Sequence, residues 1–93
     1  MREKQIEQKL VKAVRSAGGI APKFVSPGYS GMPDRIVLLP GGHVGFVEVK
    51  APGCSPRPLQ LARHGQLRDL GFTVCVLDDE RRIGEVLDDI RTS

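Results

Sequence analysis

Apolar residues recur every three or four positions in the N-terminal segment, which is the spacing of one face of an α-helix. Charged residues fill the positions between them, and the pattern stops at Gly18 and Gly19, which favour a helix end. The sequence therefore predicts an amphipathic helix over residues 3–17. Its apolar stripe consists of Ile6, Leu10, Ala13, Val14 and Ala17.

Two segments rich in aliphatic residues follow, at 34–39 and 44–50, and the turn sequence Pro40-Gly41-Gly42-His43 separates them. This arrangement is typical of a β-hairpin. A shorter apolar piece, Lys23-Phe24-Val25, precedes the turn-rich residues 27–33 and predicts a weak first strand within residues 20–26.

The C-terminal third predicts a helix, a strand and a helix. Ser55 is a candidate helix cap with Pro56 in the tolerated first position, and the second helix is expected over 58–70, ended by Gly71. Residues 72–77 are almost all apolar, as in a strand buried on both faces. Asp78 and Asp79 can cap a last helix whose apolar stripe is formed by Ile83, Val86, Leu87 and Ile90.

The order of elements is helix, three strands, helix, strand, helix, which predicts a single α/β domain over residues 1–93 with a mixed sheet flanked by helices. The strand at 44–50, the helix at 58–70 and the strand at 72–77 are expected to form a right-handed crossover.

Composition excludes several classes of protein. No apolar run approaches the roughly 20 residues needed to span a bilayer, and the charged N-terminal segment does not resemble a signal peptide, so a cytoplasmic protein without membrane contact is expected. Two isolated cysteines, Cys54 and Cys75, cannot complete a zinc site. Aromatic residues make up only 4%, which argues against a protein that stacks many single-stranded bases.

The charge is unevenly distributed along the chain. Residues 1–68 contain 11 Lys and Arg but only four acidic residues, whereas residues 69–93 contain three basic and seven acidic residues. A basic face suits a phosphate backbone, although many solvated surfaces are also basic. The few carboxylates in the basic part of the chain therefore call for a specific role.

Glu48 and Lys50 are expected on one face of their strand, because side chains alternate along a strand. If the hairpin loop is Pro40 to Gly42, Leu39 pairs with His43, and this register carries Asp34 opposite Glu48. A two-residue loop would instead pair Asp34 with Val49. Taken alone, Glu-x-Lys is also common as an exposed charge pair, so the combination with Asp34 carries the prediction.

Two adjacent carboxylates favour a hard cation, Mg²⁺ or Mn²⁺, because they would otherwise repel each other. The amine of Lys50 could orient a metal-bound water and stabilise charge that develops at phosphorus. The residue set therefore predicts metal-assisted hydrolysis of a phosphodiester.

Pro33-Asp34, followed after 13 residues by Glu48-Val49-Lys50, resembles the PD-(D/E)XK nuclease signature. More narrowly, the segments 31–35, 47–52 and 58–60 are similar to the virus-type replication-repair nuclease (VRR-NUC) domain. This resemblance implies a restriction-endonuclease-like core of one helix, a three-stranded meander, a crossover helix and another strand. It also implies a metal site made by Asp34, Glu48 and the carbonyl of Val49, a catalytic Lys50, and contributions from Gln60 and Glu7, with Glu3 as the second choice for the helical glutamate.

Basic residues that flank these motifs are candidates for contact with nucleic acid. His64, one helical turn after Gln60, could contact DNA or face the site. The candidates are Lys23, Arg35, Arg57, Arg63 and His64.

The resemblance implies a structure-directed DNA endonuclease, similar to a Holliday-junction resolvase, acting in replication, recombination or repair on branched DNA. A homodimer is expected, because a four-way junction needs two incisions and one chain of this size offers one site. The alternatives are a flap or nicking nuclease and a catalytically silent nucleic-acid-binding module.

Overall fold

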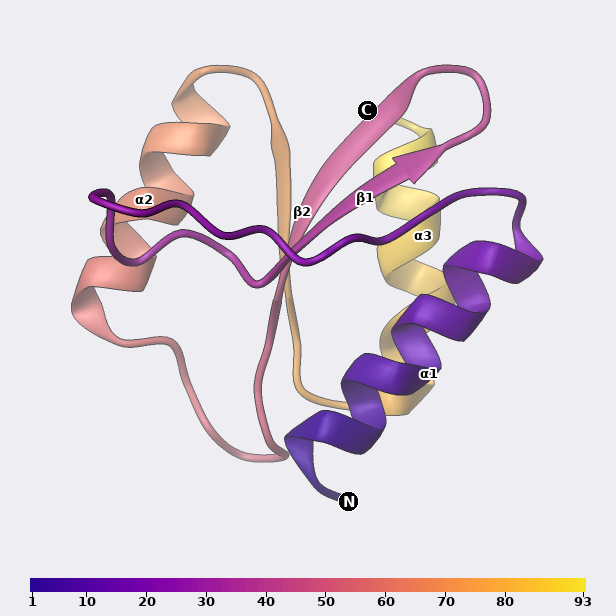
Figure 1. The fold of residues 1–93 in the computed structure, drawn as a ribbon, viewed down its shortest axis with the longest axis horizontal. Coiled ribbons are helices and arrows are strands. Elements are labelled where there is room, and N and C mark those ends of the chain that lie inside the picture. The colour runs from indigo at the N-terminus through magenta and orange to yellow at the C-terminus, as the bar shows by residue number, and fades with distance from the viewer.

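The computed structural model describes all 93 residues, and it arranges the helices on both sides of a small sheet (Figure 1). α1 and α3 lie on one side of the sheet and α2 lies on the other. A single 3₁₀ turn, η1 (Glu80–Arg82), leads into α3. The elements are α1 (Glu3–Ser16), β1 (Arg35–Leu39), β2 (His43–Val49), α2 (Pro58–Asp69), β3 (Thr73–Leu77) and α3 (Ile83–Arg91).

The sheet has the order β1-β2-β3, with β1 antiparallel and β3 parallel to β2. Leu39 pairs with His43, so the hairpin has the three-residue loop expected from the sequence. The chain crosses from β2 to the adjacent parallel strand β3 through α2. These features confirm the predicted α/β fold with a mixed, helix-flanked sheet.

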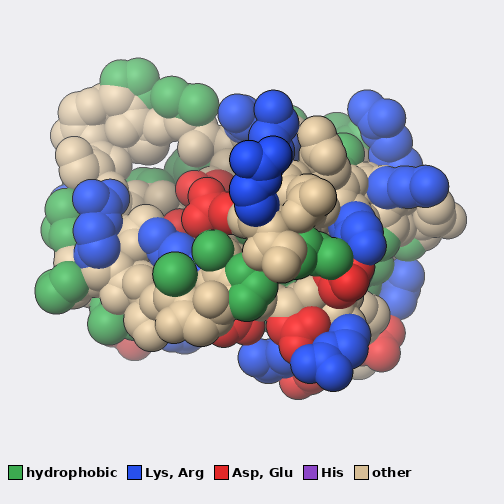
Figure 2. All heavy atoms as spheres, turned by 90° about the horizontal axis from the view of Figure 1, so that it is seen from below, with side chains coloured by type: hydrophobic (Ala, Val, Ile, Leu, Met, Phe, Trp, Pro, Cys, Tyr) green, Lys and Arg blue, Asp and Glu red, His purple; other side chains and the backbone are tan.

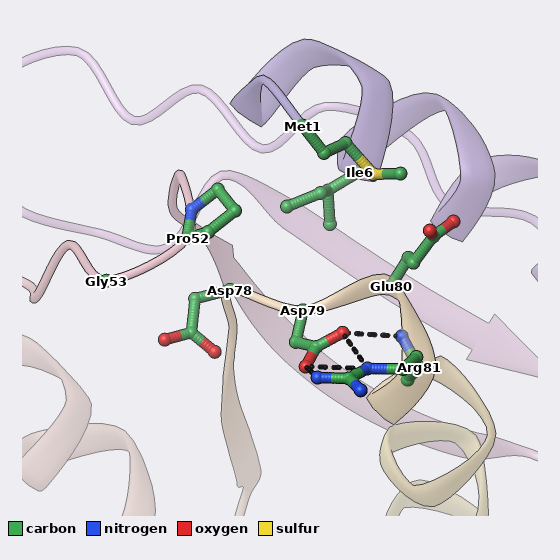
Figure 3. Close-up of a pocket in the computed structure, with 8 residues that line it drawn as sticks. All are labelled: Met1, Ile6, Pro52, Gly53, Asp78, Asp79, Glu80 and Arg81. Carbon is green, nitrogen blue, oxygen red and sulfur yellow. Dashed lines mark hydrogen bonds and ion pairs between the residues drawn. The ribbon is translucent and has the colours of Figure 1, made fainter.

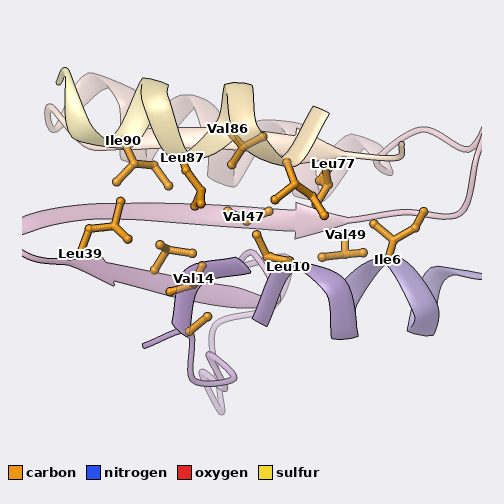
Figure 4. Close-up of a cluster of buried hydrophobic side chains, with 13 residues drawn as sticks. Ile6, Leu10, Val14, Leu39, Val47, Val49, Leu77, Val86, Leu87 and Ile90 are labelled. Atoms are coloured by element: carbon orange, nitrogen blue, oxygen red, sulfur yellow. The ribbon is translucent and has the colours of Figure 1, made fainter. Parts of the chain in front are cut away.

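The main core lies between the sheet and the pair α1 and α3 (Figure 4). It contains 13 buried apolar residues, which come from alternating positions of the strands, from one stripe each of α1 and α3, and from Ala21 before β1. The alternation predicted for β2 is present, because Val47 and Val49 enter this core while Phe46 packs on the α2 side with Leu67 and Val74. The expected stripes are buried in α1 (Ile6, Leu10, Val14) and in α3 (Ile83, Val86, Leu87, Ile90).

α3 approaches β2 so closely that only glycine fits at position 45. A Cβ atom built on Gly45 would overlap the side chain of Ile90, which is itself fully buried. The absent side chain therefore sets the distance between helix and sheet, and this contact holds β2 from the face opposite Glu48.

The first expected strand is not a regular strand. Within residues 20–26, Ile20 and Lys23 form only isolated antiparallel bridges to β1. Pro22 accepts a hydrogen bond of 3.2 Å from the Ile36 N–H but, as a proline, has no N–H to donate in return. The expected meander is thus corrected to a two-stranded hairpin with an interrupted segment beside it.

α2 begins at Pro58, as expected, but its cap differs from the prediction. The N-cap is Arg57, two positions later than the expected Ser55. The Arg57 N–H donates to Gln60 Oε1 at 2.8 Å, which satisfies one of the free backbone donors of a helix start.

None of the helices is long and apolar enough to cross a membrane.

Candidate active site

Glu48 is buried in the middle of the sheet, on the face covered by α2, with only 1% of its surface exposed. The strand alternation that sends Val47 and Val49 into the main core turns this carboxylate toward α2. Its Oε2 accepts a hydrogen bond of 3.0 Å from the Gln60 amide, and its Oε1 has no hydrogen-bond partner. A buried carboxylate with a free oxygen is costly unless something else binds it.

Asp34 lies one residue before β1, at the end of the sheet where β2 finishes. The hairpin register that pairs Arg35 with Val47 continues to place Asp34 opposite Glu48. Asp34 Oδ2 accepts a hydrogen bond of 2.8 Å from the Val49 N–H, which fixes this carboxylate against the β2 backbone. The predicted juxtaposition of the two acidic residues is therefore present in the fold.

Lys50 and Gln60 complete the surroundings of Glu48. Lys50 follows the last residue of β2, and its Nζ lies 3.6 Å from Glu48 Oε2. Gln60 uses both ends of its amide, because Oε1 caps α2 while Nε2 donates to Glu48. The start of α2 is thus coupled to the position of the carboxylate.

The pKa of Glu48 is raised from 4.5 to about 7. Burial is the main cause, and the charge of Asp34 adds to it, whereas the Lys50 ammonium acts in the opposite direction. Two neighbouring carboxylates, one with a free buried oxygen, form a donor set that suits a hard divalent cation. The chain has no group of three or more Asp, Glu, His or Cys side chains arranged to hold a metal ion.

The chain is similar to known proteins in both sequence and fold. A phage protein named "Putative nuclease p44", from Acyrthosiphon pisum secondary endosymbiont phage 1, is 56% identical over 80 residues, which is 86% of each chain. A solved structure described as a VRR_NUC domain has a TM-score of 0.86 and 28% identity, and the match covers 95% of this chain and 97% of the other. The chain belongs to the VRR-NUC nuclease family. No family model matches the sequence.

In this VRR-NUC domain, Glu7 does not contact Glu48. Its carboxylate accepts a hydrogen bond of 2.9 Å from Arg35, on the α1 side of the sheet. The Arg35 guanidinium also donates to the carbonyl of Ala21 at 2.9 Å. Arg35, a candidate for contact with nucleic acid, is thus engaged by two partners within the protein. Glu7 and Asp34 nevertheless line the same shallow pocket, of about 270 Å³.

The remaining basic candidates for contact with DNA differ in whether their side chains are already bound within the protein. Lys23, which lines the pocket beside Asp34, and Arg57 are exposed and form no ion pair. Arg63 instead donates to the carbonyl of Ser30 at 2.8 Å and lies 3.8 Å over the ring of Tyr29. Figure 2 shows basic and acidic side chains interspersed on one face of the molecule.

His64 is not at the surface, contrary to the expectation that it contacts nucleic acid. Its side chain is fully buried, and Nε2 lies 3.5 Å from Glu48 Oε1. Burial is the main cause of the lowered pKa of His64, so the ring is held neutral. The spacing of Gln60, His64 and Leu67 along α2 indicates that His64 lies on the buried face of the helix, because residues three and four apart share a helix face.

A separate hollow of about 300 Å³ lies beyond the ends of β2 and β3 (Figure 3). The Asp79 carboxylate there is held by Arg81 at 2.8 Å, and this hydrogen bonding lowers the pKa of Asp79 to about 2. None of the predicted site residues lines this hollow, so we do not place the active site there. Its lining is Met1, Ile6, Pro52, Gly53, Asp78, Asp79, Glu80 and Arg81.

Proposed function

We propose that this VRR-NUC nuclease is a Mg²⁺-dependent endodeoxyribonuclease, also active with Mn²⁺, that hydrolyses phosphodiester bonds in branched DNA. The observation that carries the proposal is the buried Glu48 beside Asp34, where burial and the charge of Asp34 raise the pKa of Glu48 to about 7. Such a pair of carboxylates is stable in ionised form when a divalent cation neutralises it.

Asp34, Glu48 and the carbonyl of Val49 would hold the cation, which when bound supplies a water of lowered pKa and neutralises phosphate charge. Val49 already donates its N–H to Asp34, so backbone and side chain are fixed relative to each other. Glu7 would join them only by releasing Arg35.

Lys50 and Gln60 have different roles in this proposal. The Lys50 ammonium, 3.6 Å from Glu48, would orient the attacking water and stabilise negative charge on the phosphoryl oxygens. Gln60 would keep Glu48 in place through its 3.0 Å hydrogen bond and would not touch the substrate.

Branched DNA is proposed as the substrate because the exposed basic side chains Lys23, in the pocket beside Asp34, and Arg57 suit phosphates rather than base edges. Contacts to phosphates position a protein on DNA without reading its sequence. The exposed and unpaired Lys23 and Arg57 are suited to such contacts, so selectivity would come from the shape of the DNA.

We further propose that the active species is a homodimer, since paired incisions at a junction require two sites. Large apolar side chains are exposed beside the interrupted edge segment and at the start of β3: Ile20, Val25, Leu70 and Phe72. A biological interface should bury more than about 1,000 Å² in total. Light scattering at micromolar concentration should give twice the 10.1 kDa chain mass. A monomer that persists on junction DNA would exclude the dimer.

Cleavage assays on linear duplex, flap and four-way junction DNA, each with Mg²⁺, Mn²⁺ or EDTA, test the proposal. We expect cleavage of the junction with either cation and none in EDTA. Asp34→Asn and Glu48→Gln should each abolish cleavage while retaining the fold. Preferential cutting of flaps would favour a flap nuclease, and binding of DNA without cleavage would favour a silent binding module.

A further inference from the structure

Three buried side-chain atoms in the whole chain have no hydrogen-bond partner, and all three belong to one pair of residues. They are Oε1 of Glu48 and both ring nitrogens of His64. Nε2 of His64 is the nearer nitrogen, at 3.5 Å from Oε1. Unsatisfied polar atoms are rare in folded proteins, so a cluster of them next to a candidate active site requires a functional explanation.

The chemistry of imidazole decides how the two groups face each other. A neutral ring has one N–H and one bare nitrogen. If the hydrogen is on Nδ1, a bare nitrogen faces the carboxylate and two lone-pair regions repel. If it is on Nε2, the ring points a donor at Glu48 Oε1 and leaves only an acceptor unmatched. The second tautomer is therefore favoured when Glu48 is ionised.

We propose that His64 is a positioning residue that holds the second oxygen of Glu48. α2 then contacts both oxygens of the Glu48 carboxylate, because Gln60 donates to Oε2 at 3.0 Å and His64 points toward Oε1. The present separation of 3.5 Å exceeds the usual length of about 2.9 Å. An ionised Glu48 would shorten it, since hydrogen bonds to charged groups are shorter than those between neutral ones.

This inference rests on the proposed cation site, because a fixed carboxylate matters most when it is a ligand. Residues that orient a metal ligand typically contribute 10- to 100-fold to metal affinity. Without His64, Glu48 would keep its hydrogen bond to Gln60 and could rotate about it. The cation would then bind a mobile ligand and would bind more weakly.

Mn²⁺ titration by calorimetry of the parent and of two variants tests the proposal. His64→Leu removes the donor and keeps an apolar side chain of similar size, and we expect its Mn²⁺ affinity to fall about 10- to 100-fold. Its melting temperature in EDTA should be unchanged or higher, because an unsatisfied polar group has been replaced by an apolar one. His64→Gln restores a donor and should recover most of the affinity. Equal affinity in the parent and in His64→Leu would overturn the proposal.

A second measurement separates this inference from the proposed function. Nitrogen-15 NMR of the metal-free protein at pH 8.5, where Glu48 is ionised, should show hydrogen on Nε2 of His64, with His64→Leu used to distinguish its signals from those of His43. The Nε2 proton signal should move in Glu48→Gln. Absence of Mn²⁺ binding in the parent would refute the cation site alone. Hydrogen on Nδ1, or a signal insensitive to Glu48→Gln, would refute the role of His64.

Discussion

In the proposed mechanism, substitution of Lys50 should affect phosphodiester cleavage without affecting the binding of the cation and of DNA. Its ammonium lies near Glu48 but is not a cation ligand, so Lys50→Ala should reduce cleavage on the order of 100-fold or more. At pH 8.5, above the parent's Glu48 pKa of about 7, Mn²⁺ and DNA affinities should stay near those of the parent. Single-turnover cleavage and calorimetry measure the two effects. A cleavage rate within about threefold of the parent would rule out the role.

Glu48 also predicts an unusual pH dependence of stability in the metal-free protein. Its pKa is raised from 4.5 to about 7, so the folded state favours the protonated carboxyl. The stabilisation is complete below pH 4.5 and is lost as the pH rises to about 7, by up to roughly 3 kcal/mol. Urea unfolding in EDTA across this range should show the loss relative to Glu48→Gln.

The control for this experiment is Glu48→Gln itself, which cannot titrate at this position. If both proteins show the same slope of unfolding free energy against pH, Glu48 is not the group responsible. Mg²⁺ should restore stability to the parent at pH 8 and should have no such effect on Glu48→Gln, since the ion binds the ionised carboxylate.

At the scale of residues, the pair Asp34 and Glu48 could be predicted because strand alternation and hairpin register are local rules. Leu39 and His43 are separated by a short loop, and their pairing fixes the rest of the hairpin. For His64 the sequence left two alternatives, contact with DNA or a place facing the site, because the choice depends on how α2 packs across the sheet. The same reason hid the contact between Arg35 and Glu7, which joins two distant segments.

At the scale of elements, the contact of α3 with β2 can be tested through Gly45. Gly45→Ala should reduce the free energy of unfolding by about 1–3 kcal/mol, because the new methyl group would overlap Ile90. Gly65→Ala is the matched control, since it lies within α2 and meets open space. That variant should be neutral or more stable by up to about 1 kcal/mol. Equal effects of the two changes would contradict the close contact.

The boundaries of the elements show which sequence signals compete. All helices and the three regular strands were predicted within one or two residues at most ends, because their apolar periodicity is strong. The cap of α2 was misplaced, since Ser55-Pro56 and Arg57-Pro58 both resemble a helix start. Only the burial of Gln60 against Glu48 selects the second. The expected first strand is interrupted because Pro22 has no N–H to donate to β1. The sequence alone did not show that Pro22 would lie beside β1.

At the scale of the whole molecule, the uneven charge predicts a salt-dependent affinity for DNA. Lys23→Gln combined with Arg57→Gln should flatten the slope of log affinity against log salt by up to about 2 units. Both side chains are exposed and form no ion pair or side-chain hydrogen bond, whereas Arg63 donates to the Ser30 carbonyl and lies over the Tyr29 ring. Fluorescence anisotropy over a range of salt concentrations measures the slope.

Arg82→Gln combined with Arg91→Gln makes the same change in net charge and serves as the control. These arginines pair with Glu85 and Asp88 in the acidic C-terminal part of the chain. Their removal should leave the slope close to that of the parent. A slope that changes equally in both double variants would mean that net charge, and not a defined contact surface, governs binding.

The composition of the face that α2 buries has a consequence for local unfolding. Two of its three buried residues, Gln60 and His64, are polar and turned toward Glu48, and only Leu67 of the three is apolar. The helix is therefore attached to the sheet largely through the site itself, and its detachment should cost less free energy than global unfolding. Amide hydrogens of α2 should exchange faster than those of α1 in EDTA and should slow when Mg²⁺ binds, making the helix a reporter of site occupancy.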